Sequence, residues 1–546
     1  MAHVRNQGNK ARALVTYDRV QVPSNYTEAV NSTYKEEWLD AMAAEMKSLQ
    51  ENNVYVEVKE DLITKKQVGS RWVFALKYDK DGNIVKFKAR LSQVYGVDYH
   101  ETYCSVVQIM TTRLMFNYAA QEKLVFKQFD IETAFLHASL EEEIYLVPPD
   151  GFKKPNVSWL LKRSLYGLKQ SPRSWYKRFS ASLEQIGFNM SKFDTSVFYQ
   201  LDPWMVIILY VDDGMIFAKL TEDIIEVLNK LRKQFKLRQV FTNVYRGIEI
   251  AFESDGIIIH QSRYIQKVLN VFNMANASAT CNPIPDLDSN SEPLSEDVPF
   301  RQVVGSLAFI ADSTRPDIAY GVNQLARKLA SPTKNDWIKA KHILKYLCGT
   351  KNYGIKYKYG SNNDDAQLQA NNNGSDHTSG KLESSNGVLL GYSDSDFGGS
   401  MCGKSTTGYI MLLNNSPFHW KSQLQRHVSL SSTESEVIAL CSLSKELACV
   451  RRMMVELHII NEVPAVIKCD NISAIRIAKN ESAASRTRHL RAQDAYIREQ
   501  IEENELSIQH VPTNEQLADL LTKRVATNKF IKNRDTLRIM QICANN

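Results

Sequence analysis

The apolar residues of this chain recur at spacings that predict short helices and strands. Residues 38–49 repeat apolar positions at helical spacing, and Asn52-Asn53 predicts the end of that helix. Residues 71–77 and 84–88 alternate on either side of Asp81-Gly82-Asn83, which predicts a hairpin with basic side chains on one face.

The same patterns continue through the rest of the chain. They predict strands at 126–129, 205–209, 214–218, 245–250, 257–261 and 465–469, and helices at 224–235, 264–272 and 337–347. In the last of these helices one face carries Trp337, Ala340, Leu344 and Leu347, and the residues off that face are Lys339, Lys345 and Tyr346. These basic residues beside an aromatic could follow a nucleic-acid backbone, but a solvated face is the simpler interpretation.

The most informative segment is Tyr210-Val211-Asp212-Asp213, between two of the predicted apolar strands. We expect an Asp-Asp-Gly turn that presents two adjacent carboxylates, an arrangement that suits a divalent metal ion. A plain hairpin explains the same residues equally well, because Asp-Gly is a strong hairpin signal by itself. Asp130, which follows the strand at 126–129, is a further carboxylate at a strand end and favours the metal interpretation.

Five blocks of sequence occur in an order that resembles the polymerase of copia-type LTR retrotransposons. They are Lys-Ala-Arg-Leu at 88–91, Asp-Ile-Glu-Thr-Ala-Phe-Leu at 130–136, Glu-Glu-Ile-Tyr at 142–145, Leu-Tyr-Gly-Leu-Lys-Gln-Ser-Pro-Arg at 165–173, and Tyr-Val-Asp-Asp at 210–213. The resemblance implies a reverse transcriptase right-hand fold with fingers, palm and thumb, followed by a helical connection.

The C-terminal part resembles a ribonuclease H-like domain. The resemblance rests on segments 391–396, 431–436, 465–470 and 510–519, which contain the acids Asp394, Glu434, Asp470 and Asp519. Each acid alone is more often a helix cap or a solvated charge, but this order favours catalysis. Three neighbouring acids match no catalytic position and are interpreted as surface acids or caps: Asp396, Glu436 and Glu515.

The expected fold class is α+β and α/β multidomain. The expected divisions are a flexible tail (1–25), fingers and palm (26–220), a thumb-like region (221–280), a linker (281–299), a helical connection (300–360), a low-complexity linker (361–387), the ribonuclease H-like domain (388–527) and a C-terminal tail (528–546). Because residues 361–386 are rich in Asn, Ser, Asp and Gly, we expect the nuclease domain to be loosely tethered.

The resemblance implies RNA-directed DNA polymerase and ribonuclease H activities by a two-metal mechanism with Mg²⁺ (or Mn²⁺). The expected catalytic residues and metal ligands are Asp130, Asp212, Asp213, Asp394, Glu434, Asp470 and Asp519. The expected partners are an RNA template, a DNA primer, an RNA-DNA hybrid and deoxynucleoside triphosphates.

The resemblance also assigns binding residues around the polymerase site. The expected nucleotide-binding residues are Lys88, Arg90, Phe135 and Tyr210, and the expected template-primer contacts are Lys169, Gln170, Arg173 and Gly247. Phe135 would collide with a ribose 2′-hydroxyl and so select deoxynucleotides; the alternative is a core phenylalanine near a strand end. The alternative for Tyr210 is an ordinary strand aromatic.

The sequence departs from the family pattern at three places. Residues expected between Leu91 and Ser92-Gln93 are missing, among them a lysine that would hold the triphosphate, so Lys88 and Arg90 would have to neutralise it. Residues 235–240 lack an expected Asp-Leu-Gly turn, and residues 488–495 depart from the nuclease pattern. A decayed relic that folds and binds nucleic acid without polymerising is therefore the rival hypothesis, and a chain in which only the nuclease works is a third.

Composition agrees with these expectations and adds little to them. The chain has 546 residues, a formal net charge of +6 and a pI near 8.6, a mild basic bias compatible with a polyanionic partner. Its 8 cysteines are scattered without Cys-x-x-Cys spacing, which indicates buried thiols in a reducing compartment and no structural zinc. Apolar runs fall far short of the ~20 residues that cross a bilayer, so we expect no membrane association and an intracellular location, either cytoplasmic in a virus-like particle or nuclear.

Overall fold

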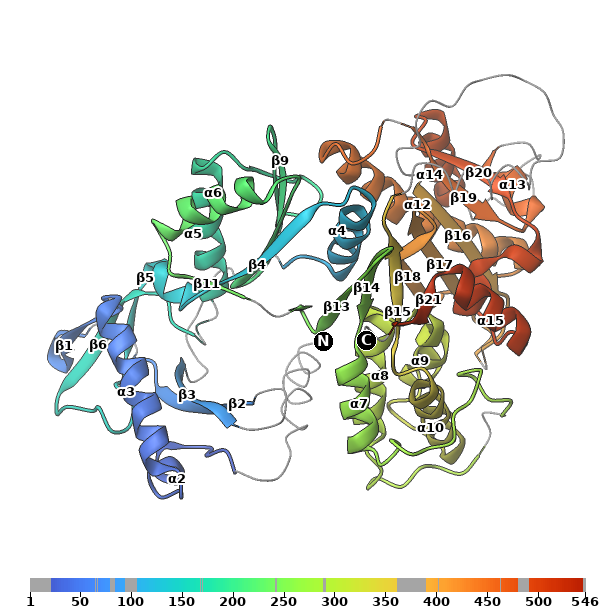
Figure 1. The fold of residues 1–546 in the computed structure, drawn as a ribbon. Helices are drawn as coiled ribbons and strands as arrows, with labels where there is room; N and C mark the ends of the chain where they lie inside the picture. Colours follow the sequence, from blue (N-terminus) through green and yellow to red (C-terminus); the bar gives the residue numbers. More distant parts are fainter. Residues whose placement is uncertain are drawn as a thin grey trace.

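The computed structural model describes residues 21–63, 65, 67–78, 84–93, 106–166, 168, 170–240, 243–287, 291–360, 389–400, 402–461, 463–479 and 491–543. Residues 1–20 of the tail predicted at 1–25, all of the linker predicted at 361–387 and residues 488–490 of the departure at 488–495 lie outside these residues. Fingers and palm form one half of the molecule, and the connection and nuclease domain form the other (Figure 1). Within the described ranges no helix is both long enough and apolar enough to span a membrane.

The fingers contain a helix packed on a two-stranded hairpin and a separate three-stranded sheet of order β1-β6-β5. The elements are α2 (Tyr26–Val30), α3 (Lys35–Glu51), β1 (Tyr55–Lys59), η1 (Glu60–Leu62), β2 (Ser70–Tyr78), β3 (Ile84–Gln93), β5 (Ser139–Leu146) and β6 (Val157–Arg163). Trp38 of α3 is fully buried, with its ring 5.2 Å from Phe74 and 4.6 Å from Phe87 of the hairpin. The structure confirms the predicted first helix and the predicted hairpin.

The palm is a six-stranded sheet of order β11-β4-β10-β9-β8-β7. Its strands are β4 (Val125–Ile131), β7 (Asn189–Met190), β8 (Val197–Leu201), β9 (Trp204–Tyr210), β10 (Asp213–Ala218) and β11 (Leu237–Gln239), and its helices are α4 (Ile109–Gln121), η2 (Ala134–His137), α5 (Ser171–Gln185) and α6 (Thr221–Arg232). Along β9, Val206 and Ile208 belong to the core that includes α4, and Met205, Ile207 and Leu209 to the core that includes α5 and α6. Burial on both faces explains why this strand is a continuous apolar run.

The thumb-like region predicted at 221–280 is wrong in its first part. Strand β11 pairs with β4, and α6 packs on the same sheet, so residues 221–239 belong to the palm. The amphipathic helix expected at 224–235 is therefore a palm helix. Its apolar face covers one face of the palm sheet, and α4 covers the opposite face.

The connection is built around a five-stranded sheet of order β12-β13-β14-β15-β21. Its elements are β12 (Val244–Tyr245), β13 (Ile248–Glu253), β14 (Gly256–His260), α7 (Ser262–Val271), α8 (Phe300–Ser313), η3 (Pro316–Ile318), α9 (Ala319–Ala326), α10 (Lys334–Gly349), β15 (Tyr353–Lys358), α15 (Thr527–Thr536) and β21 (Ile539–Gln541). The C-terminal tail predicted at 528–546 is therefore wrong. Most of that range is α15 and β21, and β21 pairs with β15 from Tyr353 opposite Gln541 to Ile355 opposite Ile539.

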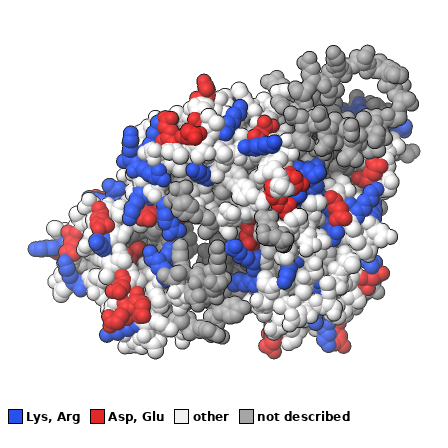
Figure 2. All heavy atoms as spheres, in the orientation of Figure 1, with Lys and Arg blue, Asp and Glu red and all other residues white. Residues whose placement is uncertain are grey.

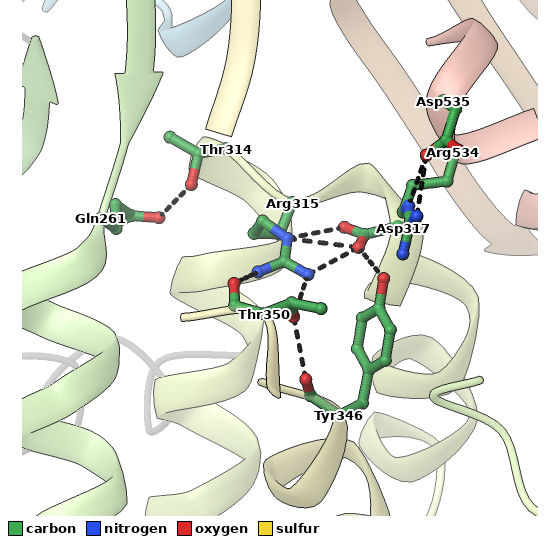
Figure 3. Close-up of polar contacts among 8 residues, drawn as sticks. All are labelled: Gln261, Thr314, Arg315, Asp317, Tyr346, Thr350, Arg534 and Asp535. Atoms are coloured by element: carbon green, nitrogen blue, oxygen red, sulfur yellow. Dashed lines mark hydrogen bonds and ion pairs between the residues drawn. The ribbon is translucent and has the colours of Figure 1, made fainter. Parts of the chain in front are cut away.

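A buried polar network joins the helices of the connection (Figure 3). The guanidinium of Arg315 donates to Asp317 at 2.7 and 2.9 Å and to Thr350 at 2.8 and 2.9 Å. The hydroxyl of Tyr346 donates to the same Asp317 carboxylate at 2.6 Å. The expectation that Tyr346 lies off the buried face of its helix is wrong, because Asp317 gives its hydroxyl a partner inside the core.

The nuclease domain is a five-stranded sheet of order β18-β17-β16-β19-β20. Its elements are β16 (Leu389–Asp396), β17 (Thr406–Leu413), β18 (Ser416–Leu424), α12 (Ser432–Glu456), β19 (Ala465–Cys469), α13 (Ile472–Ala478), α14 (Arg491–Glu502), β20 (Leu506–His510), η5 (Thr513–Glu515) and η6 (Leu517–Leu521). Strands β16, β19 and β20 are parallel. Strand β17 pairs antiparallel with β16, and β18 pairs antiparallel with β17. The strand predicted at 465–469 is confirmed.

The palm helix α4 docks directly on the nuclease strands β17 and β18. Arg113 is buried, donates to the Phe418 carbonyl at 2.6 Å, and stacks its guanidinium 3.8 Å from the ring centre of Trp420. Asn117 donates to the carbonyls of Leu413 at 2.9 Å and Ser416 at 3.2 Å. The nuclease domain is therefore held to the palm, contrary to the loose tether expected from the linker composition.

The buried network supports a stability prediction. Asp317→Asn leaves the Arg315 charge in the core without its carboxylate, so we expect the connection to lose about 3 kcal/mol of stability. Asp286→Asn is the matched control, because Asp286 is 86% exposed in its ion pair with Arg524 and such pairs contribute about 0–1 kcal/mol. Calorimetric unfolding of both variants measures the difference, and equal transition temperatures would contradict the prediction.

Candidate functional sites

The first site is a pair of acids held opposite each other by strand pairing. Asp213 begins β10 and is paired with Asp130 of β4, while Tyr210 at the end of β9 is the other partner of Asp213. The turn therefore consists of Val211 and Asp212, and the expected Asp-Asp-Gly turn is wrong. Gly214 lies inside β10 instead, where a Cβ would come within 2.2 Å of the Phe129 ring, so the close packing there favours glycine.

The turn is held in an uncommon conformation. Val211 has φ +62°, a left-handed backbone that is costly for a β-branched residue. The indole of Trp175 donates to the Val211 carbonyl at 2.8 Å, and the Ile131 amide donates to the Asp212 carbonyl at 3.0 Å. These two bonds fix Asp212 beside Asp130 and Asp213.

The three acids line a cavity of about 600 Å³ between the palm and the fingers. Lys86 and Lys88 of β3 and Arg238 of β11 line the same cavity. Arg238, which the sequence motifs do not single out, is paired with Asp130 across β11 and β4. The only signal for it in the sequence is the presence of basic residues on either side of Leu237.

The expected nucleotide-binding residues differ in their positions. Lys88 lines the cavity, and the side chain of Arg90 lies outside the described part of the chain. Phe135 lies in the palm core, 9% exposed, with its ring centre 4.7 Å from that of Tyr166. Tyr166, which the sequence motifs do not single out, lines the cavity together with Phe87. The ring of Tyr210 lies 4.3 Å beneath the guanidinium of Arg246.

Three of the expected template-primer contacts, Gln170, Arg173 and Gly247, do not line this cavity. Gln170, which precedes α5, donates to the Glu142 carboxylate at 2.9 Å, and Arg173 lies in the first turn of that helix. Gly247 has φ +80° in the turn between β12 and β13, where a Cβ would lie 3.0 Å from the Phe309 ring. Lys169 is outside the described residues.

The second site lies on the nuclease sheet. Strands β16 and β19 are parallel with Tyr392 opposite Lys468, so the same register continued by two residues places Asp394 beside Asp470. Asp519, in η6, is fully buried and faces Asp394 across the amine of Lys523, which lies 2.7 Å from Asp519 and 3.4 Å from Asp394. Lys523 was not recognised from the sequence.

Glu436, and not Glu434, faces these acids. Glu434 was expected to be catalytic and Glu436 to be a surface acid or cap, and the structure corrects both expectations. The Glu434 carboxylate accepts a hydrogen bond from the Leu430 amide at 2.6 Å and serves the start of α12, where Ser431 is the N-cap. Glu436 is 7% exposed and accepts from the Ser395 amide at 3.2 Å. Its carboxylate forms a cluster with Cys469 and Asp470 whose ligand atoms all lie within 4.8 Å of one another.

Two of the nuclease acids, Asp394 and Glu436, are buried and have raised pKa values. Burial, with a further contribution from Asp519, raises the pKa of Asp394 to about 6 against the opposing effect of Lys523. Burial also raises the pKa of Glu436, and the charges of Asp394 and Asp470 raise it further. Among the described residues, the second carboxylate oxygen of Glu436 has no hydrogen-bond partner. Hard carboxylate oxygens that repel one another are ligands that fit Mg²⁺ at both sites.

Several known proteins are similar to this chain in sequence. A family model described as reverse transcriptase (RNA-dependent DNA polymerase) matches residues 52–286. The retrovirus-related Pol polyprotein from transposon TNT 1-94 of Nicotiana tabacum is 34% identical over 95% of this chain, and the putative transposon Ty5-1 protein of Saccharomyces cerevisiae is 30% identical over 57% of this chain and 97% of its own length. The chain spans 39% of the tobacco protein.

A solved structure is also similar over most of the chain. It is the foamy viral protease-reverse transcriptase in complex with an RNA/DNA hybrid, which covers 91% of this chain and 55% of that chain at 10% identity with a TM-score of 0.49.

The raised pKa of Asp394 gives a pH-dependent prediction for the metal-free protein. The folded pKa of about 6 exceeds the ordinary 3.8, so this group stabilises the fold at low pH and the contribution is lost as pH rises through about 6. Asp394→Asn should therefore stabilise the metal-free nuclease domain near pH 7.5 by up to about 3 kcal/mol, and by about half as much near pH 5. Calorimetry at the two pH values tests this, with Asp286→Asn as control; destabilisation near pH 7.5 would contradict it.

Proposed function

This chain belongs to the Pol polyprotein family of copia-type retrotransposons, and we propose that it is an RNA-directed DNA polymerase with a ribonuclease H domain. The observation that carries the polymerase proposal is the pairing of Asp130 with Asp213, beside Asp212, on the wall of a cavity that also has lysines. The cavity combines ligands for divalent cations with positive charge for a triphosphate. A decayed relic would inherit the same acids, so an activity assay separates the two hypotheses.

In the polymerase reaction the three acids would hold Mg²⁺ (or Mn²⁺) against the primer end and the incoming deoxynucleoside triphosphate. Bound metal ions would activate the primer 3′-hydroxyl and stabilise the leaving phosphate oxygens. Lys86 and Lys88 line the opposite wall, where their charge would neutralise the triphosphate. The further lysine of the family is missing from this sequence after Leu91, so these two side chains carry this part of the proposal.

The sugar of the incoming nucleotide would meet Tyr166, whose ring lines the cavity and rests on Phe135. We propose that Phe135 selects deoxynucleotides through this contact, by holding the Tyr166 ring where a ribose 2′-hydroxyl would collide. Arg246 over the ring of Tyr210 would in the same way fix Tyr210 beneath the primer terminus.

Template and primer would be held through their backbones. Lys and Arg side chains are frequent over the fingers and palm and around the middle of the molecule (Figure 2). Arg173, Gln170 and the Gly247 turn are proposed contacts to phosphate and sugar, together with Lys169. Contacts of this kind position a strand without reading its sequence, which copying of any template requires.

In the nuclease reaction Asp394, Glu436, Asp470 and Asp519 would hold two metal ions and direct water at RNA paired with DNA. Lys523 lies between Asp394 and Asp519 and supplies positive charge where metal-free carboxylates would repel one another. Glu434 contributes to the start of α12 and has no part in this proposal.

Extension of a DNA primer on an RNA template in Mg²⁺ tests the polymerase. Asp212→Asn removes one charged metal ligand, and we expect primer extension to fall at least about a hundredfold, since losing even an outer-shell partner costs up to that much. Asp202→Asn is the matched control, because Asp202 is an exposed residue at the far end of the β8–β9 strands. A wild-type chain that binds template and folds but does not extend the primer would favour the relic.

Two glutamates of one helix separate catalysis from capping in the nuclease. Glu436→Gln should abolish Mg²⁺-dependent cleavage of the RNA strand of a hybrid. Glu434→Gln should keep that activity and lose about 1 kcal/mol or less of stability, because it weakens the hydrogen bond from the Leu430 amide at the helix start. Hybrid cleavage assayed beside thermal unfolding distinguishes them, and loss of cleavage in Glu434→Gln alone would restore the assignment made from the sequence.

A further inference from the structure

The nuclease site contains a thiol that the proposed hydrolysis does not use. Cys469 is the last residue of β19, directly before Asp470, and is fully buried. Its sulfur belongs to the cluster in which the ligand atoms of Glu436, Cys469 and Asp470 all lie within 4.8 Å of one another. Residues 465, 467 and 469 alternate inward along β19, so strand geometry and the adjoining α12 direct the thiol toward Glu436.

Glu436 gives independent evidence that this cluster faces a ligand. It is 7% exposed, and only one of its two carboxylate oxygens accepts a hydrogen bond, from the Ser395 amide. The other oxygen is buried without a hydrogen-bond partner in the part of the chain that the structure describes. Leaving a carboxylate oxygen buried and unpaired is costly, and a cation held between Glu436, Asp470 and the sulfur would remove that cost.

We propose that Cys469, Glu436 and Asp470 form a site for a thiophilic divalent cation, of the class of Zn²⁺ and Cd²⁺, inside the nuclease centre. Thiolate and carboxylate ligands suit such ions, whereas Mg²⁺ demands oxygen ligands and gains nothing from sulfur. Three protein ligands leave a fourth position for water. Binding forms a metal–sulfur bond and releases the thiol proton to solvent.

A thiophilic ion at this site should inhibit the nuclease and not the polymerase. This expectation rests on the proposed nuclease function. A thiophilic ion would take Glu436 and Asp470 away from Mg²⁺, leaving Asp394 and Asp519 without two of their partners. Among the described residues, no cysteine lines the polymerase cavity. Low concentrations of Cd²⁺ should therefore inhibit hybrid cleavage and spare primer extension in the same molecule.

Direct binding of Cd²⁺ to the full chain tests the site without reference to activity. We would titrate Cd²⁺ in the presence of Mg²⁺ and record the ultraviolet charge-transfer absorption of cadmium–thiolate bonds. The variant is Cys469→Ser, and Cys441→Ser is the matched control, because Cys441 is a buried thiol of the same domain on α12. Since exposed cysteines also bind Cd²⁺, the signal is the difference between each variant and the wild type.

We expect Cys469→Ser to lose one cadmium–thiolate increment and to bind Cd²⁺ at least about tenfold more weakly at this site, the lower end of losses measured for outer-shell partners. Cys441→Ser should match the wild type. Glu436→Gln and Asp470→Asn should weaken the same increment while retaining the thiol. Circular dichroism checks that each variant is folded, and Cys469→Ala replaces Cys469→Ser if the serine disrupts β19.

Two results would overturn the inference. One is an unchanged Cd²⁺ titration in both folded Cys469 variants. The other is an increment that needs Cys469 but is indifferent to Glu436→Gln and Asp470→Asn, since the sulfur would then bind alone. A Cys469-dependent increment in a chain that never cleaves hybrids with Mg²⁺ would support this site and refute the nuclease proposal. Active Mg²⁺ cleavage without the increment would do the reverse.

Discussion

Strand register is the constraint on which both acidic clusters depend. In the palm, the pairing of β10 with β4 puts Asp213 opposite Asp130, and the close fit of Gly214 against Phe129 resists a shift of that pairing. In the nuclease domain, the parallel register of β16 and β19 brings Asp394 level with Asp470. A slip of one residue would turn a carboxylate to the opposite face of its sheet. The chemistry proposed for both sites is therefore decided by how the strands pair.

Local sequence patterns predicted most elements of the fold but not how distant segments combine. The helix at Trp38, the strand at 465–469 and the hairpin of β9 and β10 could be predicted because each is defined by its own periodicity. Two placements could not be predicted in this way: residues 221–239 in the palm and β21 in the connection. Both depend on pairing with strands far away in sequence. Tyr346 was misplaced for the same reason, because its partner Asp317 lies on another element.

The acids of the two sites were found by motif, and the error within them has a geometric cause. Residues two apart on a helix project in nearly opposite directions, at about 100° per residue, so Glu434 and Glu436 cannot serve one site. The sequence places both in a helix start, where a capping role and a catalytic role use the same residue type. Only the position of α12 against β16 shows which glutamate meets Asp394. Lys523 and Arg238 belong to no recognised motif. Only their positions beside Asp394, Asp519 and Asp130 in the structure identify them.

The addition of β21 to the connection sheet also constrains the order in which the chain can fold. Strands β12 to β15 are made well before the nuclease domain, yet the edge of β15 stays uncovered until residues 539–541 leave the ribosome. An exposed strand edge is a template for pairing with other chains, and long-range pairing is slow. During synthesis the sheet therefore stays incomplete until the segment that follows the nuclease domain is made. A chain truncated within the nuclease domain would expose the edge of β15 and be prone to aggregation.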